Sequence, residues 1–326
     1  MDEDKKAEGE PDIQPRSALV RRALGKTAAV FDRLGAYSYL SALDRHGFAY
    51  YRELYENALL RIDRRIVHGK LEPVDLRDFP QVVRFPRYDI REALFIGSFD
   101  PFQMTHLAMA LRYLASDSAR APVVFVVPEG YDNPQKPAKS DYTYRCELLG
   151  MQTLGVFDPL IAPLDIGEGA DTIEIVRRFI RLFPGASMHL THILGSDALP
   201  YAARLLPQDM AAWKEEAALR NVGFSYDAFV VKREGAPDIS SHVQSIREQG
   251  HEVVVDEREI LTPSSTDFRE HHAFSIVFPT ESVIRHMEVL FRYNLNRPWG
   301  VCGLDDTKER GITQDKPAPG WSGSCE

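Results

Sequence analysis

The chain has 326 residues, an apolar content of 44% and a formal net charge of −9. Its length allows for about two domains of typical size, and its composition excludes collagen-like, low-complexity and disulfide-rich classes. An acidic chain is a poor candidate for sequence-independent nucleic-acid binding, because such binding relies on a basic surface. A local anion site is still compatible with this charge, since helix N-termini and a few placed cations are enough to form one.

The cysteines and the N-terminus indicate the compartment. Cys146, Cys302 and Cys325 are far apart and form no CxxC pair, so they predict neither a disulfide framework nor a zinc site. No apolar run approaches the ~18 residues of a membrane span, and the charged N-terminus lacks the apolar core of a signal peptide. We therefore expect a cytoplasmic protein with small-molecule partners, without nucleic-acid or membrane partners, and the sequence leaves homo-oligomer formation open.

The N-terminal part predicts helices. Residues 1–15 are polar and contain two prolines, which indicates disorder. Two helical apolar stripes follow, one starting at Ser17 and one spanning Phe48 to Ile66. Because such stripes must be buried against a partner surface, residues 16–90 should form a helical extension with a proline-containing connector.

From residue 91 the pattern changes to alternating strands and helices. Apolar strands are expected at 93–97, 123–127, 160–163, 189–195, 228–233 and 251–256. Helices are expected at 107–114, 142–154, 172–183 and 209–218, and after 264–269. The alternation predicts an α/β domain over 91–295, with a doubly wound, mostly parallel, Rossmann-like sheet that binds ligands at the carboxyl ends of its strands. Residues 296–326 are expected to form a poorly ordered tail.

The first chemical motif is FIGSFDPFQMTH at residues 95–106. Gly97 permits a turn that other residues would strain, and His106 falls in the first turn of the following helix. A helix N-terminus offers unpaired N–H groups and partial positive charge, so an imidazole there can donate a hydrogen bond to a phosphate oxygen. The alternative interpretation of His106 is a purely structural histidine.

The second motif is LTPSSTDFRE at residues 261–270. Ser264 and Asp267 have the spacing of a capping box. The hydroxyls of this helix start can hold phosphate oxygens, and Arg269 lies one turn further on, where its guanidinium can reach the same end. A plain helix cap is the alternative. One doubly wound sheet can bring both motifs to its carboxyl edge.

Together the motifs resemble the two signatures of the nucleotidylyltransferase superfamily, a G-x-F-D-P…(H/T)-x-x-H loop and a late S-S-T-x-[IF]-R helix start. Further segments resemble the nicotinate-mononucleotide adenylyltransferase branch: 128–145, 169–176, 193–199 with Trp213, and 229–235. The resemblance covers residues 91–290. It departs from the bacterial H-x-G-H form, because Gln103 replaces the first His and Thr105 replaces the Gly. Gln103 can donate a hydrogen bond but carries no charge.

The resemblance implies direct nucleotidyl transfer, in which a substrate phosphate attacks the α-phosphate of a nucleoside triphosphate and pyrophosphate leaves. It implies ATP as a substrate, nicotinate or nicotinamide mononucleotide as the acceptor, and Mg²⁺ that bridges triphosphate oxygens while mostly keeping its own waters. Such chemistry depends on positioning and on stabilising the charge that builds on the phosphates.

The resemblance also implies residue roles. The α-phosphate is assigned to Gly97, Ser98, Phe99, Gln103 and His106. The departing phosphates are assigned to Ser264, Ser265, Thr266 and Arg269, with Lys136 and Arg145 as further cations. The ribose, or the waters of the metal, are assigned to Gly195 and Asp197, and the acceptor to Arg145, Thr172 and Trp213. The expected catalytic residues are His106, Arg269 and Lys136.

Alternatives exist at both levels. Lys136 alone is an ordinary loop lysine, Arg145 can pair with neighbouring carboxylates on a helix surface, and Trp213 can be a core residue. At the level of function, the departures at Gln103 and Thr105 favour two alternatives. One is an adenylyl- or cytidylyltransferase acting on another phosphate or phosphonate acceptor, and the other is a catalytically weak, nucleotide-binding regulatory protein.

Overall fold

The computed structural model describes residues 17–34, 42–73, 89–131, 141–261 and 277–283. Its centre is a parallel sheet of six strands in the order β3-β2-β1-β4-β5-β6. The strands are β1 (Asp89–Gly97), β2 (Val124–Pro128), β3 (Ile161–Pro163), β4 (Ser187–Gly195), β5 (Gly223–Arg233) and β6 (Val253–Ile260). From β1 the strand order runs outward to β3 on one side, and from β4 it runs outward to β6 on the other side, so the order of the strands reverses between β1 and β4. The predicted doubly wound α/β class is therefore confirmed, with its switch point at this pair.

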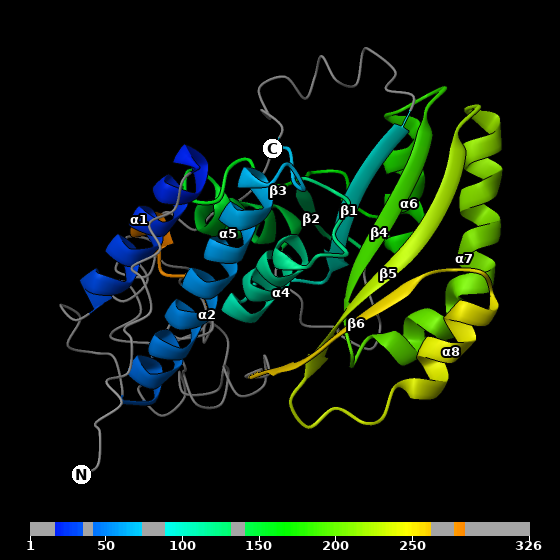
Figure 1. Ribbon diagram of the computed structural model, residues 1–326. Helices are drawn as coiled ribbons and strands as arrows, with labels where there is room; N and C mark the ends of the chain where they lie inside the picture. Colours follow the sequence, from blue (N-terminus) through cyan, green and yellow to red (C-terminus); the bar gives the residue numbers. More distant parts are fainter. Residues whose placement is uncertain (1–16, 35–41, 74–88, 132–140, 262–276, 284–326) are drawn as a thin grey trace, which may run out of the picture.

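Helices cover both faces of the sheet (Figure 1). One face carries α4 (Met104–Ala115) and α5 (Tyr142–Thr153), and beyond them α1 (Ala18–Arg33) and α2 (Ala42–Val67). The other face carries α6 (Thr172–Arg181), α7 (Leu199–Leu219) and α8 (Ser240–Glu248). Among the described residues, no helix is both long and apolar enough to cross a membrane.

The strands are apolar on both sides because helices cover both faces. In β1, Phe95 packs into the core on the side of α4, whereas Leu94 and Ile96 pack into the core on the side of α6 and α7. Every residue of β2 is buried. Each fully buried large apolar side chain contributes about 1.5–3 kcal/mol relative to exposure, so the sheet is a rigid platform for the loops at its carboxyl edge.

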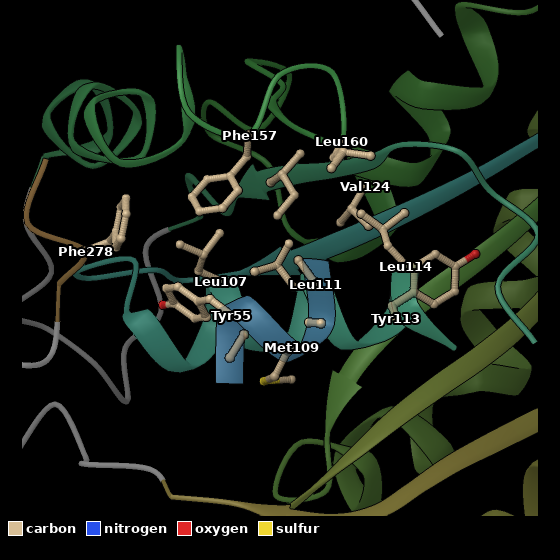
Figure 2. Close-up of a cluster of buried hydrophobic side chains, with 14 of the residues drawn as sticks. Tyr55, Leu107, Met109, Leu111, Tyr113, Leu114, Val124, Phe157, Leu160 and Phe278 are labelled. Atoms are coloured by element: carbon tan, nitrogen blue, oxygen red, sulfur yellow. The ribbon is translucent and has the colours of Figure 1, made fainter. Parts of the chain in front are cut away.

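The N-terminal helices share a core with the α4 face of the sheet. Helix α2 packs along α4, and Figure 2 shows Tyr55 of α2 beside Leu107 and Leu111 of α4, with Phe157 and Phe278 nearby. The rings of Tyr55 and Phe278 have centroids 5.8 Å apart. The apolar stripe of α2 is thus buried against the helix that carries the first motif.

The structure differs from the sequence prediction in two helices. Helix α7 begins ten residues earlier than expected and contains Pro207, a residue that usually ends or kinks a helix. Helix α8 was not predicted, because only Val243 and Ile246 of its residues are buried and so short a stripe gives a weak periodic signal. The expectations for residues 1–15, for the second motif at 264–269 and for 296–326 lie outside the described residues.

Candidate functional site

The first motif lies at the switch point of the sheet. Strand β1 ends at Gly97 and β4 ends at Gly195, and Leu94 of β1 pairs with His192 of β4. Each of these paired residues is three positions before the end of its strand. The two strand ends are therefore adjacent, and the loop from Gly97 to α4 lies beside the loop that follows Gly195. Ligands of doubly wound sheets bind in this crevice.

His106 stands at the N3 position of α4, and its side chain caps the backbone of Gln103, the N-cap residue. The backbone N–H of Gln103 donates to Nδ1 of His106 over 3.0 Å. Because Nδ1 accepts this hydrogen bond, the neutral ring must carry its proton on Nε2. Nε2 is therefore the donor of the ring, and none of the described residues accepts a hydrogen bond from it.

The surroundings of His106 keep the ring neutral. The rings of Phe95, Phe99 and Phe102 surround it, with centroids 5.7, 5.1 and 5.6 Å from the imidazole. Burial in this apolar environment, together with the positive charge of Arg233, lowers the pKa of His106 to about 3. His106 is therefore a neutral hydrogen-bond donor at physiological pH.

The turn after β1 is tightly built around Phe99. A Cβ at Gly97 would lie only 3.1 Å from Cε1 of the Phe99 ring, so glycine allows the ring to fold back over the strand end. Phe99 itself is buried and has a φ of 42°, a backbone region that few bulky residues adopt. This compact turn brings the chain from Gly97 to the start of α4.

Arg145 lies beneath the loops that follow β1 and β2. It is 3% exposed, and its Nη1 donates to the carbonyl oxygens of Ser98 and, over 2.9 Å, Glu129. The sequence interpretation placed Arg145 either among the phosphate-binding cations or in a surface pair. The structure instead shows a buried guanidinium that joins two loop backbones.

Glu129 links three parts of the site, and the sequence analysis missed it. Its N–H donates to the carbonyl oxygen of Gly97 over 2.9 Å, its carbonyl accepts from Arg145, and its Oε1 accepts from Oγ1 of Thr172 over 2.6 Å. Thr172, an expected acceptor contact, is thus placed in the first turn of α6 with its hydroxyl on Glu129. The position of Glu129 after Pro128 at a strand end was the available signal.

Arg233 is the second site residue that the sequence analysis left without a role. It ends β5, forms a close ion pair with Asp197 through Nη1, and donates its backbone N–H to Oγ of Ser196 over 2.9 Å. A Cβ at Gly195 would collide with Oδ1 of Asp197. Glycine at this strand end therefore lets Asp197 turn back toward Arg233, close to His106.

Trp213 lies in the core, which differs from the expected role as a stacking platform for the acceptor. It is 1% exposed, and Nε1 donates to the carbonyl oxygen of Ile173 over 3.2 Å. Its ring packs against Tyr226 with centroids 5.4 Å apart. The indole bridges α6, α7 and β5, and neither of its faces is exposed to a ligand.

Five of the predicted site residues lie outside the described residues: Lys136, Ser264, Ser265, Thr266 and Arg269. Within the described ranges, no group of three His, Cys, Asp or Glu side chains could hold a metal ion.

The fold and the site define a doubly wound α/β protein with a candidate anion site at its switch point. No protein-family model and no curated protein matches the chain. A solved structure of Plasmodium falciparum nicotinic acid mononucleotide adenylyltransferase complexed with NaAD is similar, at 16% identity and a TM-score of 0.41 over 64% of this chain and 97% of that one. The same enzyme complexed with APC is similar at 15% identity and a TM-score of 0.39, with the same coverage.

Proposed function

We propose that the protein is a nucleotidylyltransferase that transfers AMP from ATP to the phosphate of nicotinate or nicotinamide mononucleotide and releases pyrophosphate. The observation that supports this most directly is the geometry of His106. A neutral imidazole with its proton on Nε2 stands in the first turn of α4, at the switch point of a parallel sheet. The ordered series of motifs between residues 95 and 269 points to the same reaction.

The neutral state of His106 suits this chemistry. An oxygen of the acceptor phosphate attacks the α-phosphorus of ATP, the bond from that phosphorus to the bridging β-phosphate oxygen breaks, and pyrophosphate leaves with the bonding electrons. A phosphate monoester has a second pKa of about 6, so near pH 7 no proton needs to be removed from the acceptor. The enzyme therefore needs donors for the charged oxygens rather than a general base.

The residues around His106 define the rest of the proposed site. The Nε2–H of His106 and the N-terminus of α4 would donate to the α-phosphate, where charge builds in the transition state. Arg233 adds a cation beside this position, held by Asp197. Ser264, Ser265, Thr266 and Arg269 are proposed for the departing β- and γ-phosphates, with Lys136 as a further cation.

Mg²⁺ is proposed to enter with the triphosphate. The described residues contain no three-ligand cluster, and Asp197, the carboxylate beside the site, is already paired with Arg233. We propose that the ion is carried mainly by phosphate oxygens and water, the oxygen ligands that a hard cation prefers. When bound, the ion supplies charge neutralisation on the phosphates.

One observation favours a second candidate, transfer to another phosphate or phosphonate acceptor or use of CTP. The burial of Trp213 removes the aromatic residue that was expected to recognise the acceptor base. The acceptor must then be selected by other residues, and a different acceptor is compatible with that change.

The test is a pyrophosphate-release assay with ATP or CTP, each combined with nicotinate mononucleotide, nicotinamide mononucleotide and a panel of phosphate and phosphonate acceptors. Release that requires ATP and one of the two mononucleotides is the expected result. Release only with another acceptor or with CTP supports the second candidate. Silence with every pair, at concentrations where ATP binding is measurable, supports the regulatory alternative and contradicts both transferase proposals.

A further inference from the structure

Two neighbouring tyrosines of α2 form hydrogen bonds with the backbone of Leu261. Oη of Tyr51 donates to the carbonyl oxygen of Leu261 over 2.9 Å, and the N–H of Leu261 donates to Oη of Tyr50 over 3.3 Å. Leu261 directly follows β6, which ends at Ile260. Helix α2 thus binds both the backbone N–H and the backbone carbonyl of Leu261, the first residue of the second motif.

The same Tyr51 hydroxyl also contacts the first motif. It lies 2.5 Å from Oγ1 of Thr105, and Oγ1 of Thr105 lies 3.3 Å from the carbonyl oxygen of Leu261. Two hydroxyl protons therefore serve three oxygen–oxygen contacts. In either arrangement of the two protons, one hydroxyl donates to Leu261 and the other donates to its neighbour, so the three oxygens form one connected unit.

This unit is dry. Tyr51 is 2% exposed and Thr105 is 1% exposed, and burial raises the pKa of Tyr51 well above its ordinary value, so the hydroxyl stays protonated. Hydrogen bonds that are linked in this way strengthen one another, and a buried hydroxyl that loses its partner costs stability. The contact is therefore a stiff connection between elements that are far apart in the sequence.

The position of the unit relates it to the proposed site. Thr105 immediately precedes His106 in the first turn of α4, and Leu261 immediately precedes the segment that contains Ser264–Thr266 and Arg269. Thr105 stands where the related motif has a glycine. Its hydroxyl gives this difference a physical role, because a glycine could not form the hydrogen bond with Tyr51.

We propose that Tyr51 is a positioning residue for nucleotidyl transfer, and that it joins the first turn of α4, which carries His106, to the end of β6. The proposal rests on the proposed function, since it concerns the same triphosphate. Its consequence is that the N-terminal helices, which the resemblance does not cover, are a working part of the site. A displacement of about 1 Å between such segments can cost around a hundredfold in rate.

The experiment compares Tyr51→Phe with Tyr55→Phe as the matched control. Tyr55 is one turn further along α2, is fully buried, and donates to the carbonyl oxygen of Met104 over 2.8 Å (Figure 2). Each variant loses one buried hydroxyl between α2 and α4, so similar decreases in Tm are expected. Only Tyr51→Phe also removes a hydrogen bond to Leu261, which then keeps its contacts with Thr105 and Tyr50.

Two variants at Thr105 complete the set. Thr105→Val keeps the shape of the side chain but removes the hydroxyl, whereas Thr105→Ser keeps the hydroxyl. We expect Tyr51→Phe and Thr105→Val to raise KM for ATP and to lower kcat/KM by roughly five- to tenfold, the size of effect that a lost buried hydrogen bond produces. We expect Thr105→Ser and Tyr55→Phe to stay within about twofold of wild type on the same scale.

The split between KM and Vmax separates positioning from simple destabilisation. Partial unfolding lowers Vmax by lowering the amount of active enzyme, but it leaves KM unchanged. The double variant Tyr51→Phe/Thr105→Val leaves neither hydroxyl to donate to Leu261, so it should be worse than either single variant. Its loss should still be smaller than the sum of the two single losses, because both changes act on one connected unit. Additive effects of the two changes, or equal KM values for Tyr51→Phe and Tyr55→Phe, would overturn the proposal.

Hydrogen exchange provides a readout that does not depend on turnover. In Tyr51→Phe, amides of residues 103–108 and of residues 258–261 should both exchange faster, whereas Tyr55→Phe should affect only the former. Unchanged exchange at 258–261 in Tyr51→Phe refutes the connection itself. If wild type releases no pyrophosphate with any pair while the exchange pattern holds, the proposed function has failed and the connection stands.

Discussion

The backbone N–H of Gln103 donates to Nδ1 of His106, and this one hydrogen bond of 3.0 Å fixes the tautomer of the imidazole. Gln103 therefore orients the imidazole, the proposed phosphate donor, through its own backbone N–H. Its side chain is not required to bear charge. The replacement of a histidine by Gln103 is compatible with an intact helix start, because the amide side chain fills the N-cap position.

The first prediction concerns the donor on His106. His106→Ala should lower kcat by about 10²-fold, the effect of removing one donor from a transition-state site, whereas His106→Gln, which keeps a neutral donor, should lose less. His106→Ala removes the Nδ1 acceptor of the cap and should lose about 1 kcal/mol of stability, whereas His106→Gln keeps a side-chain oxygen that can accept from the N–H of Gln103 and should lose less. Steady-state kinetics and urea unfolding measure the two effects. Near-wild-type kcat in His106→Ala would refute the placement of the α-phosphate.

The second prediction concerns the pH dependence of transfer. Since burial lowers the pKa of His106 to about 3, this residue should not titrate between about pH 5 and pH 8. The profile of kcat between about pH 5 and pH 8 should then have the same shape in wild type and in His106→Gln, with the acceptor phosphate as the main ionising group. An acidic limb near the ordinary histidine pKa that is present in wild type and absent in His106→Gln would contradict a neutral donor.

The third prediction concerns the pH dependence of stability. Burial also lowers the pKa of His192, to about 4 from 6.5. A lowered histidine pKa means that the unfolded state binds the proton more readily than the folded state. The stabilisation is therefore complete above the unfolded pKa and is lost as the pH falls toward the folded pKa.

Urea unfolding at fixed pH values measures this loss. Between about pH 6.5 and pH 4.5, each of His106 and His192 should lower the free energy of unfolding by up to ~1.4 kcal/mol per pH unit. His192→Gln should remove one such contribution from the slope. His192 lies outside the candidate site, so transfer kinetics serve as the control. A slope that is identical in wild type and in His192→Gln would show that His192 does not titrate with a lowered pKa.

The fourth prediction separates the two roles of Arg145. As a buried joint between the carbonyl oxygens of Ser98 and Glu129, Arg145 should be intolerant of Lys, which lacks the planar fork. Arg145→Lys should cost about 1.5–3 kcal/mol of stability and should lower kcat because the loop after β1 is displaced. The exposed neighbouring position provides the control Glu147→Gln, which should stay within about 0.5 kcal/mol of wild type. A raised KM for ATP at unchanged stability would instead restore Arg145 to the phosphate-binding cations.

The fold could be predicted because the signal is local. Apolar strands that end in Gly97 and Gly195 alternate with amphipathic helices, and the parallel, doubly wound sheet follows from that alternation. His106 could be placed for the same reason, since its position depends only on the strand, the turn and the helix start around it.

The residues that the sequence did not reveal depend on which elements are neighbours in space. Arg233 reaches the site because β5 lies beside β4, and Tyr51 reaches it because α2 packs on α4. Neither adjacency has a local sequence pattern. The same limit applies to Trp213, because the sequence shows an aromatic residue on a helix but not whether that face of the helix is covered.

The last prediction tests the position of Trp213. A core indole that packs on Tyr226 and donates to Ile173 should be costly to truncate. Trp213→Ala should lose about 3–5 kcal/mol, and Trp213→Phe should lose less because most of the apolar contact remains. Neither variant should change KM for the acceptor, since the ring is 1% exposed and packs against protein atoms. Chemical unfolding and acceptor titrations with Trp213→Phe measure both quantities. A tenfold rise in acceptor KM, about 1.4 kcal/mol, at nearly unchanged stability would show that the indole faces the substrate, and would favour a mononucleotide base as its partner.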